Sequence, residues 1–353
     1  MKYIGNKARL LNFINSSLAK VCSLKNGVFC DIFSGTATVG RFFKEKNFKI
    51  ISNDFMHYSF LQQYSLIKLN KIPTFEKLRV IKNINFERDL KLNYNNILLF
   101  LNNLKPKKGY FFNNYAPSGS AGRQYFTNEN AQTIDSIRDT LQDWFLNKII
   151  NNSEYYLLIS NLVNAADHVA NISGTYGAYL KIWRPTALKK ISLKETSIYN
   201  NNYNNLVYNE NANKLIRKIS GDIIYIDPPY NSRQYAPNFH VLESLSVWDK
   251  QQLKGKTGLR NYENQKSDFS LKNKCYEAMD DLINNAKFKY IMLSYNNEGL
   301  IPINQIYKIL SNKGKLYQFD LNYRRFRTER DHKYRKYKSV DNKVVEHLFI
   351  LKK

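Results

Sequence analysis

The segment Gly221–Tyr235, GDIIYIDPPYNSRQY, decides the fold of this chain. Its apolar and β-branched run from Ile223 to Ile226 predicts a buried strand. The strand leads into Asp227-Pro228-Pro229-Tyr230, and two successive prolines can neither continue a strand nor enter a helix interior. The chain must therefore turn at the carboxyl end of the strand. In an open α/β sheet, this is the edge where ligands bind.

The turn brings a carboxylate, a rigid backbone carbonyl and an aromatic ring to one point. These groups suit a planar base that carries an exocyclic amine. Asp227 and the carbonyl of Pro228 can accept the two N–H bonds of the amine, and Tyr230 can stack on the face of the ring. An ordinary proline turn after a strand is the alternative interpretation, because a bare Asp-Pro-Pro is compatible with both.

An earlier part of the chain has the pattern of a nucleoside-binding unit. A predicted strand at Gly27–Ile32 runs into the loop DIFSGTATVG at Asp31–Gly40, and a helix is expected through Arg41–Lys46. A second strand, Lys49–Ser52, leads to Asp54. Asp54 follows Asp31 by roughly 20 residues, the offset at which an acid meets a ribose in such folds.

The loop after the first strand favours a small adenosine ligand. Gly35 allows close approach of the backbone, and the following helix start offers N–H groups to a carboxylate or phosphate. The loop lacks the richer glycine pattern of dinucleotide-binding proteins. We therefore expect an adenosine ligand with a carboxylate tail.

The middle of the chain changes to helical periodicity, with helices predicted at Glu129–Ile149 and Ser153–Asn171. We predict an inserted, mainly helical lobe at residues 65–199, between the two parts of a catalytic domain at residues 1–64 and 200–353. A loop at Asn114–Phe126 offers Arg123 and Tyr125 for hydrogen bonding and stacking. An ordinary surface excursion of a single domain is the alternative.

Further strands and helices are expected after the insert. Strands are predicted at Leu206–Tyr208 and Tyr290–Ser294, and a closing strand at Val344–Leu351 is expected at a sheet edge. A helix is expected at Phe239–Trp248. The polar, basic segment Gln251–Phe269 contains glycines and is interpreted as a mobile loop.

The charge of the chain indicates a polyanionic partner. Its 353 residues contain 54 Lys and Arg but 29 Asp and Glu, a net charge of +25. Nucleic acid is the first candidate, ahead of an anionic membrane, because no separate basic amphipathic helix is present. The 3 Cys and 5 His are scattered without metal-ligand spacing, so no metal is expected. No signal peptide or membrane span is seen, and a cytoplasmic protein is expected.

One stretch combines this charge with aromatic rings. Tyr323–Lys338, YRRFRTERDHKYRKYK, interleaves basic side chains with Tyr and Phe, which favours a hairpin that follows phosphates. A solvated charged face is the alternative. The basic and aromatic side chains predicted to contact DNA are Arg123, Tyr125, Arg233, Lys254, Lys256, Arg324, Arg325 and Arg327.

With these motifs in order, the sequence resembles the N6-adenine-specific DNA methyltransferases of the alpha group, relatives of the Dam and FokI methylases. The motifs that carry the resemblance are KYIGNKARLL at Lys2–Leu11, DIFSGTATVG, NDF at Asn53–Phe55, NENA at Asn209–Ala212 and DPPYNSRQY. The insert lies between the ribose acid and the catalytic strand, as in that group. Ala37 stands where the family loop usually has glycine, and Asn211 where an acid is common.

The resemblance implies a Rossmann-like α/β fold, with a seven-stranded methyltransferase sheet and an inserted helical target-recognition domain. It implies S-adenosylmethionine as cofactor, with Asp54 on the ribose and the amide oxygen of Asn211 on the adenine amine. The cofactor-binding residues implied are Tyr3, Lys7, Asp31, Phe33, Ser34, Gly35, Thr36, Asp54, Asn211 and Asp227. The catalytic residues implied are Asp227, Pro228, Pro229 and Tyr230.

The function expected from these motifs is methyl transfer from S-adenosylmethionine to N6 of an adenine flipped out of double-stranded DNA. A cognate restriction endonuclease is a candidate partner. Two alternatives remain open. One is a methyltransferase for another amine, in RNA adenine, cytosine N4 or a protein side chain. The other is a catalytically inactive nucleic-acid-binding relative.

Overall fold

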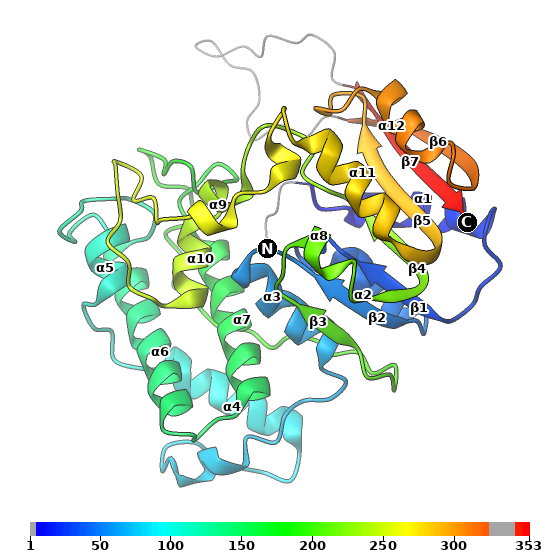
Figure 1. Cartoon of the computed structure of the whole chain (residues 1–353). Helices are drawn as coiled ribbons and strands as arrows, with labels where there is room; N and C mark the ends of the chain where they lie inside the picture. The colour runs from blue at the N-terminus through cyan, green and yellow to red at the C-terminus, as the bar shows by residue number, and fades with distance from the viewer. Residues whose placement is uncertain (1–4, 325–342) are drawn as a thin grey trace. The chain divides into compact units, whose positions relative to one another are not determined.

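The computed structural model describes residues 5–324 and 343–353, which divide into two compact units (Figure 1). The unit here called the sheet unit comprises Ile4–Met56, Tyr203–Tyr235 and Glu263–Lys353. Within the described residues, the unit here called the helical unit comprises His57–Asn202 and Ala236–Tyr262.

The sheet unit contains a seven-stranded sheet with the order β3-β2-β1-β4-β5-β7-β6. The strands from β3 to β5 are parallel, whereas β7 is antiparallel to both of its neighbours. This mixed sheet confirms the predicted α/β, Rossmann-like class. The strands are β1 (Val28–Asp31), β2 (Lys49–Asn53), β3 (Leu206–Tyr208), β4 (Ser220–Ile226), β5 (Lys287–Asn296), β6 (Lys315–Arg324) and β7 (Lys343–Lys352).

Strand β4 confirms the interpretation of the apolar run before the proline pair. Ile223, Ile224, Tyr225 and Ile226 are all buried, as expected for a central strand covered on both faces. The strand pairs in parallel with β1 on one side and β5 on the other. It ends immediately before Asp227, because the prolines that follow cannot donate backbone N–H bonds to a ladder.

The expected position of the closing strand was wrong. β7 was predicted at a sheet edge, but it pairs along its length with both β5 and β6. Its residues Leu348–Leu351 are buried, which fits an internal strand. The strand at this edge is β6, in which Leu316, Phe319 and Leu321 are half-buried.

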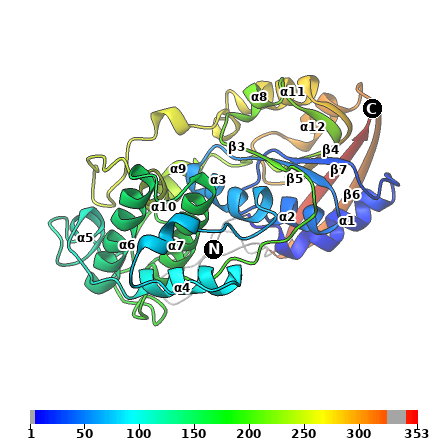
Figure 2. The ribbon, with the colours of Figure 1, turned by 90° about the horizontal axis from the view of Figure 1, so that it is seen from below.

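Helices cover both faces of the sheet (Figure 2). One face carries α8, α11 and α12, and the other carries α1 and α2. The helices of this unit are η1 (Ala8–Leu10), α1 (Leu11–Ala19), α2 (Thr38–Glu45), α8 (Ala212–Leu215), η4 (Glu263–Gln265), η5 (Asp268–Ser270), α11 (Cys275–Asn285) and α12 (Ile303–Leu310).

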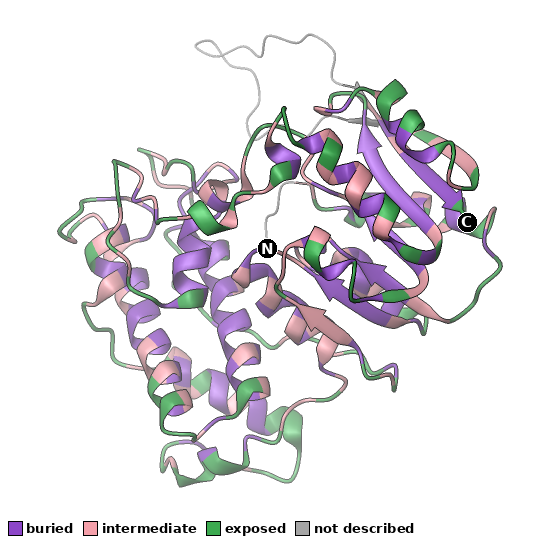
Figure 3. Ribbon diagram, in the orientation of Figure 1, coloured by how far each residue is buried: buried purple, intermediate pink, exposed green. Residues whose placement is uncertain are grey.

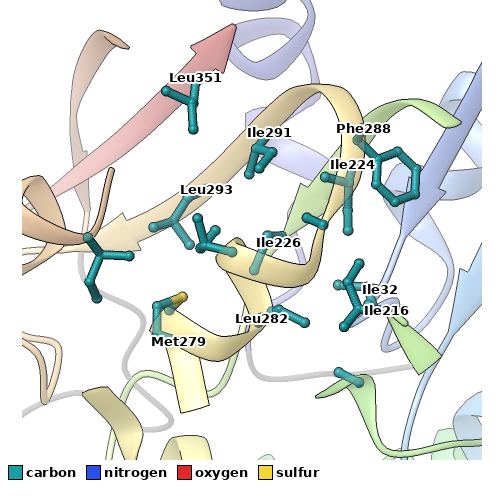
Figure 4. Close-up of a cluster of buried hydrophobic side chains, with 14 of the residues drawn as sticks. Ile32, Ile216, Ile224, Ile226, Met279, Leu282, Phe288, Ile291, Leu293 and Leu351 are labelled. Carbon is teal, nitrogen blue, oxygen red and sulfur yellow. The ribbon is translucent and has the colours of Figure 1, made fainter. Parts of the chain in front are cut away.

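The core of the sheet unit lies between the sheet and the layer that contains α11. Ile224 and Ile226 of β4 point into it together with Ile291 and Leu293 of β5, facing Leu282 of α11 (Figure 4). Because side chains alternate across a strand, Tyr225 and Asp227 belong to the other face, the one that α2 covers. Figure 3 shows the resulting continuous burial along the central strands.

The helical unit is built mainly from α-helices. The two long helices predicted here are confirmed as α6 (Asn128–Leu146) and α7 (Asn152–Val169). Each has an N-cap: Thr127 accepts from Asn130 N, and Asn151 forms a capping box with Glu154. The other helices are α3 (His57–Gln63), η2 (Tyr64–Lys68), η3 (Glu76–Val80), α4 (Leu90–Asn102), α5 (Tyr110–Tyr115), α9 (Tyr235–Asn238, whose first residue belongs to the sheet unit) and α10 (His240–Val247).

None of the helices in residues 5–324 and 343–353 is long and apolar enough to cross a membrane.

Candidate active site

Three loops that carry acids meet at one edge of the sheet. β1 ends at Asp31, β2 is followed by Asp54, and β4 is followed by Asp227. β1 pairs with both β2 and β4 in parallel, so the carboxyl ends of these three strands lie next to each other. The structure therefore brings together the two motifs that the sequence placed in separate parts of the chain.

The loop after β1 is held tightly by hydrogen bonds. Ser34 N donates to Asn53 O at 2.9 Å, and Gly35 N donates to Asp54 Oδ2 at 2.8 Å. The hydroxyl of Thr36 accepts from Asn6 Nδ2 at 3.2 Å. Gly35 has φ 52°, a left-handed conformation that glycine adopts without strain.

Ala37, where the family usually has glycine, has φ 60°. It is fully buried at the N-cap of α2. A residue with a Cβ pays a cost of about 1–3 kcal/mol in this left-handed region. Ala37 therefore introduces local strain into the loop.

Asp31 is buried beneath the loop. Its Oδ2 accepts from Gly40 N at 3.0 Å, while its Oδ1 receives no hydrogen bond within the described residues. Burial raises the pKa of Asp31 to about 7; the Gly40 bond opposes this rise, and the charges of Asp227 and Asp54 add to it. An unsatisfied acid of this kind favours a cationic ligand.

Asp227 forms an ion pair with Lys7. Lys7 Nζ lies 3.3 Å from Asp227 Oδ1 and 3.5 Å from Glu346 Oε2. Burial raises the pKa of Asp227 to about 6; Lys7 opposes this effect and Glu346 adds to it. Burial alone would lower the pKa of Lys7, but Asp227, Tyr225 and Glu346 outweigh it and raise that pKa well above its usual value. Asp227 is therefore ionised at neutral pH and can accept hydrogen bonds.

Sequence reasoning missed Glu346. It lies on β7, far along the chain from both Lys7 and the DPPY motif, and its side chain is 9% exposed. An acid within the apolar strand that ends in HLFILKK is the one signal that could have drawn attention to it.

Tyr230 is half-buried and has an aromatic neighbour. Its ring makes an edge contact with Tyr295, with centroids 6.2 Å apart, and its carbonyl accepts from Leu300 N at 2.8 Å. Tyr295 is fixed in turn by a bond from Ile301 N to its hydroxyl at 2.9 Å. The loop after β5 thus supports the ring predicted to stack on a base. Pro228 is buried and Pro229 half-buried in the same turn.

Asn211, predicted to contact the adenine of the cofactor, lies at the start of α8. Its amide oxygen accepts from Asn213 N at 3.0 Å and Lys214 N at 3.2 Å, and so caps α8. The expectation that this oxygen accepts from an adenine amine stays a prediction. Phe33 is half-buried and packs edge-on against Phe269, with centroids 5.0 Å apart.

Arg123 and Tyr125 were predicted to contact DNA, and the structure corrects this for both. The guanidinium of Arg123 is buried and donates to the carbonyls of Lys256 at 3.0 Å, Gly255 at 3.0 Å and Asn114 at 2.9 Å. Tyr125 is fully buried, and its hydroxyl lies 2.7 Å from Tyr176 O. Both side chains are used inside the helical unit.

Arg123 hydrogen-bonds to a turn at Lys254–Leu259, which we call the basic turn. Lys254 and Leu259 exchange two backbone hydrogen bonds of 2.8 Å. Lys254 and Lys256 are exposed on this turn. The segment was expected to be mobile, but these bonds fix its basic turn within the helical unit.

The remaining residues that were predicted to contact DNA or the cofactor lie at the surface, at the end of a strand or outside the described residues. Arg233 is exposed in the loop after the DPPY motif. Arg324 is the last residue of β6. Tyr3, Arg325 and Arg327 lie outside the described residues, as does most of the basic stretch Tyr323–Lys338.

The balance of charge at this site suits a cationic ligand. Four acids, Asp31, Asp54, Asp227 and Glu346, belong to this site, and Lys7 forms ion pairs with two of them, Asp227 and Glu346. Within the described residues, no group of three or more His, Cys, Asp or Glu side chains is arranged to hold a metal ion.

A parallel sheet closed by an antiparallel β7, with acids and a glycine loop at its carboxyl edge, defines a Rossmann-like methyltransferase. Residues 3–309 match the profile of the D12 class N6 adenine-specific DNA methyltransferases. The chain belongs to this family. Its reaction therefore requires a methyl donor.

Curated relatives agree with this assignment. The type II methyltransferase M.NlaIII of Neisseria lactamica is 37% identical over 355 residues, covering 100% of this chain and 99% of that protein. M.FokI of Planomicrobium okeanokoites is 38% identical over 359 residues, and the modification methylase StsI of Streptococcus sanguinis is 37% identical over 313. The chain covers 53% and 46% of these two proteins, about half of their length. No solved structure gives a significant match.

Proposed function

We propose that this chain transfers a methyl group from S-adenosylmethionine to N6 of an adenine at a specific site in double-stranded DNA. The observation that carries the proposal is Asp227 Oδ1. This oxygen is buried in the DPPY turn and receives no hydrogen bond within the described residues. Beside Tyr230, it is a suitable acceptor for the amine of a flipped base.

The residues around the loop after β1 suit S-adenosylmethionine. Asp31 offers a buried oxygen without a donor to a positively charged group. Gly35 allows close approach of the backbone, and Asp54, which accepts from Gly35 N, would also accept from a ribose hydroxyl. When bound, the cofactor would supply a methyl group on a sulfonium: the amine nitrogen bonds to the methyl carbon as the carbon–sulfur bond breaks, the neutral thioether leaves, and the methylated amine gives up one proton.

Asp227 and Tyr230 would hold the acceptor base. Asp227 and the carbonyl of Pro228 accept the two amine hydrogens and so direct the nitrogen lone pair out of the ring plane. Tyr230 replaces the stacking that the base loses when it leaves the duplex, a cost of about a few kcal/mol. Catalysis then comes mainly from positioning.

The chain's positive charge would hold the phosphates. The exposed Lys254 and Lys256 on the basic turn, and Arg233 near the site, are the candidate contacts among the described residues. In this proposal the helical unit reads the DNA sequence. Binding is expected to weaken linearly in log K with log salt concentration.

The names of M.NlaIII and M.FokI, both type II methyltransferases, support a role in restriction and modification. We include in the proposal a cognate restriction endonuclease that cuts the same site when it is unmethylated. We also propose that the reaction takes place in the cytoplasm.

The test is transfer of labelled methyl groups from S-adenosylmethionine to duplex DNA, structured RNA and protein in parallel. N6-methyladenine in the digested DNA is the expected product. Label in RNA, in cytosine or in protein would instead support another amine acceptor. Absence of both transfer and S-adenosylmethionine binding would support an inactive nucleic-acid-binding relative.

A further inference from the structure

Lys7 lies between two carboxylates and forms an ion pair with each of them. Its Nζ is 3.3 Å from Asp227 Oδ1 and 3.5 Å from Glu346 Oε2. The bond to Glu346 has hydrogen-bond geometry, whereas Asp227 Oδ1 receives no hydrogen bond within the described residues. Glu346 therefore competes with Asp227 for the ammonium.

Glu346 is held in position by the sheet. It lies on β7 opposite Asn296 of β5 and Leu321 of β6, so hydrogen-bonded strands fix its backbone on both sides. Its side chain is 9% exposed, and that of Lys7 is 5% exposed. A buried acid needs a compensating partner, and Lys7 supplies it.

We propose that Glu346 is a positioning residue for methyl transfer: by accepting the hydrogen bond of Lys7, it keeps Asp227 Oδ1 open to the amine of the target base. This inference rests on the proposed function. Without Glu346, the ammonium has one strong acceptor left and turns to Asp227. The amine would then compete with a charge-assisted hydrogen bond for the same oxygen.

The charges around Asp227 also determine how the rate of methyl transfer depends on pH. The ionisable groups that interact with Asp227 are Lys7 before η1, Asp31 on β1, Tyr225 on β4, Tyr230 and Tyr235 after β4, and Glu346 on β7. The tyrosines are neutral in the working range, because burial raises their pKa values above the usual 10. Glu346 raises the pKa of Asp227 and Lys7 lowers it. Removal of the Glu346 charge must therefore lower the pKa of Asp227.

The experiment compares Glu346→Gln with the wild type in full-length protein on duplex DNA. We expect kcat to fall by about tenfold to a hundredfold, as for a misplaced reacting group. The Kd for S-adenosylmethionine and the KM for DNA should stay close to the wild-type values. The acidic limb of the kcat profile should move to lower pH. A merely structural role would not move the limb in this direction.

Glu45→Gln is the matched control, because it removes the same charge from an exposed pair with Arg41 on α2. Its kcat and acidic limb should match the wild type. An unchanged kcat in Glu346→Gln, or a limb that moves to higher pH, would overturn the inference. If the wild type transfers no methyl group to DNA, the proposed function fails instead.

A second variant covers the case in which Glu346→Gln does not fold. Glu346→Asp keeps the charge and draws the oxygen back from Lys7 by one methylene. Reduced kcat at unchanged KM and an unmoved acidic limb are expected for this variant. Full activity would contradict the positioning role.

Discussion

The backbone N–H of Gly35 donates a hydrogen bond of 2.8 Å to Asp54 Oδ2. The other oxygen of Asp54 accepts from Met56 N at 2.9 Å. One carboxylate therefore ties the loop after β1 to the end of β2. A loop fixed in this way loses little freedom when a ligand binds, which favours affinity.

Asp54→Ala should weaken S-adenosylmethionine binding by about ten- to a hundredfold, since it removes both the support of Gly35 and an acceptor for the ribose. Calorimetric titration of the cofactor measures this. DNA binding should be retained. Glu277→Ala, an exposed acid on α11, is the control and should bind as the wild type does. Equal affinity of Asp54→Ala and wild type would refute the assigned role of Asp54.

The raised pKa of Asp31 predicts that the free energy of unfolding depends on pH. Its pKa in the folded protein is raised to about 7 from 3.8, so the folded state binds this proton more tightly than the unfolded state. Its contribution to stability therefore grows as the pH falls from 8 towards 6. Asp31→Asn lacks this titration. Its stability relative to the wild type should fall by about 1 kcal/mol over that interval.

Urea unfolding of both proteins at several pH values measures this difference. The wild type and Asp31→Asn must be compared because His57 and His240 lower the stability of the folded protein as the pH falls. Burial lowers the pKa of each histidine to about 4. Both histidines are present in each protein, so their effect cancels. A difference that is constant with pH would show that Asp31 is ionised throughout, and a difference that grows in favour of Asp31→Asn on acidification would contradict the raised pKa of Asp31.

Much of the sheet unit could be predicted from the sequence, because its signals are local. The apolar run before Asp227 and the glycine loop after β1 mark two strand ends, and parallel pairing brings such ends together. Asp54 could be identified by its spacing from Asp31 alone. These three acids meet at one edge of the sheet.

The rest depends on contacts between distant parts of the chain. Glu346 reaches Lys7 only because β7 inserts beside β5, and no local pattern encodes that pairing. Arg123 lies in a glycine-containing loop that suggested exposure, yet its guanidinium satisfies carbonyls of the basic turn. The segment Ala236–Tyr262 is part of the compact helical unit, although it begins only a short distance after the DPPY motif in the sequence.

Gly299→Ala should disturb the support of Tyr230. An added Cβ would clash with Cε1 of the Tyr295 ring, and Tyr295 packs against Tyr230. We expect a loss of about 1–3 kcal/mol in the free energy of unfolding and a lower kcat. Thermal unfolding and methyl-transfer assays measure the two effects.

Gly177→Ala is the control for this substitution, because its Cβ would meet no atom closer than 3.8 Å. It should leave both stability and kcat nearly unchanged. If Gly299→Ala behaves in the same way, the Tyr295 ring does not restrain Tyr230.

Arg123→Lys should loosen the basic turn while it keeps the charge. A lysine cannot replace three guanidinium bonds to the carbonyls of Asn114, Gly255 and Lys256. We expect about 1–3 kcal/mol of destabilisation and a raised KM for DNA, with the Kd for S-adenosylmethionine unchanged. Hydrogen exchange of the basic turn should become faster.

Arg79→Lys is the matched control, since Arg79 lies on the surface of the same unit in a pair with Glu76. It should leave KM for DNA unchanged. An unaltered KM in Arg123→Lys, together with faster exchange, would mean that the basic turn does not contact DNA.

The most direct test of the account is the methyl-transfer rate of Asp227→Asn on duplex DNA. Asparagine has nearly the same shape, but it loses the negative charge and replaces one acceptor oxygen with a donor group. The rate should fall by about a thousandfold or more, while S-adenosylmethionine and DNA still bind. A rate within about tenfold of the wild type would contradict the claim that Asp227 accepts the amine of the target adenine.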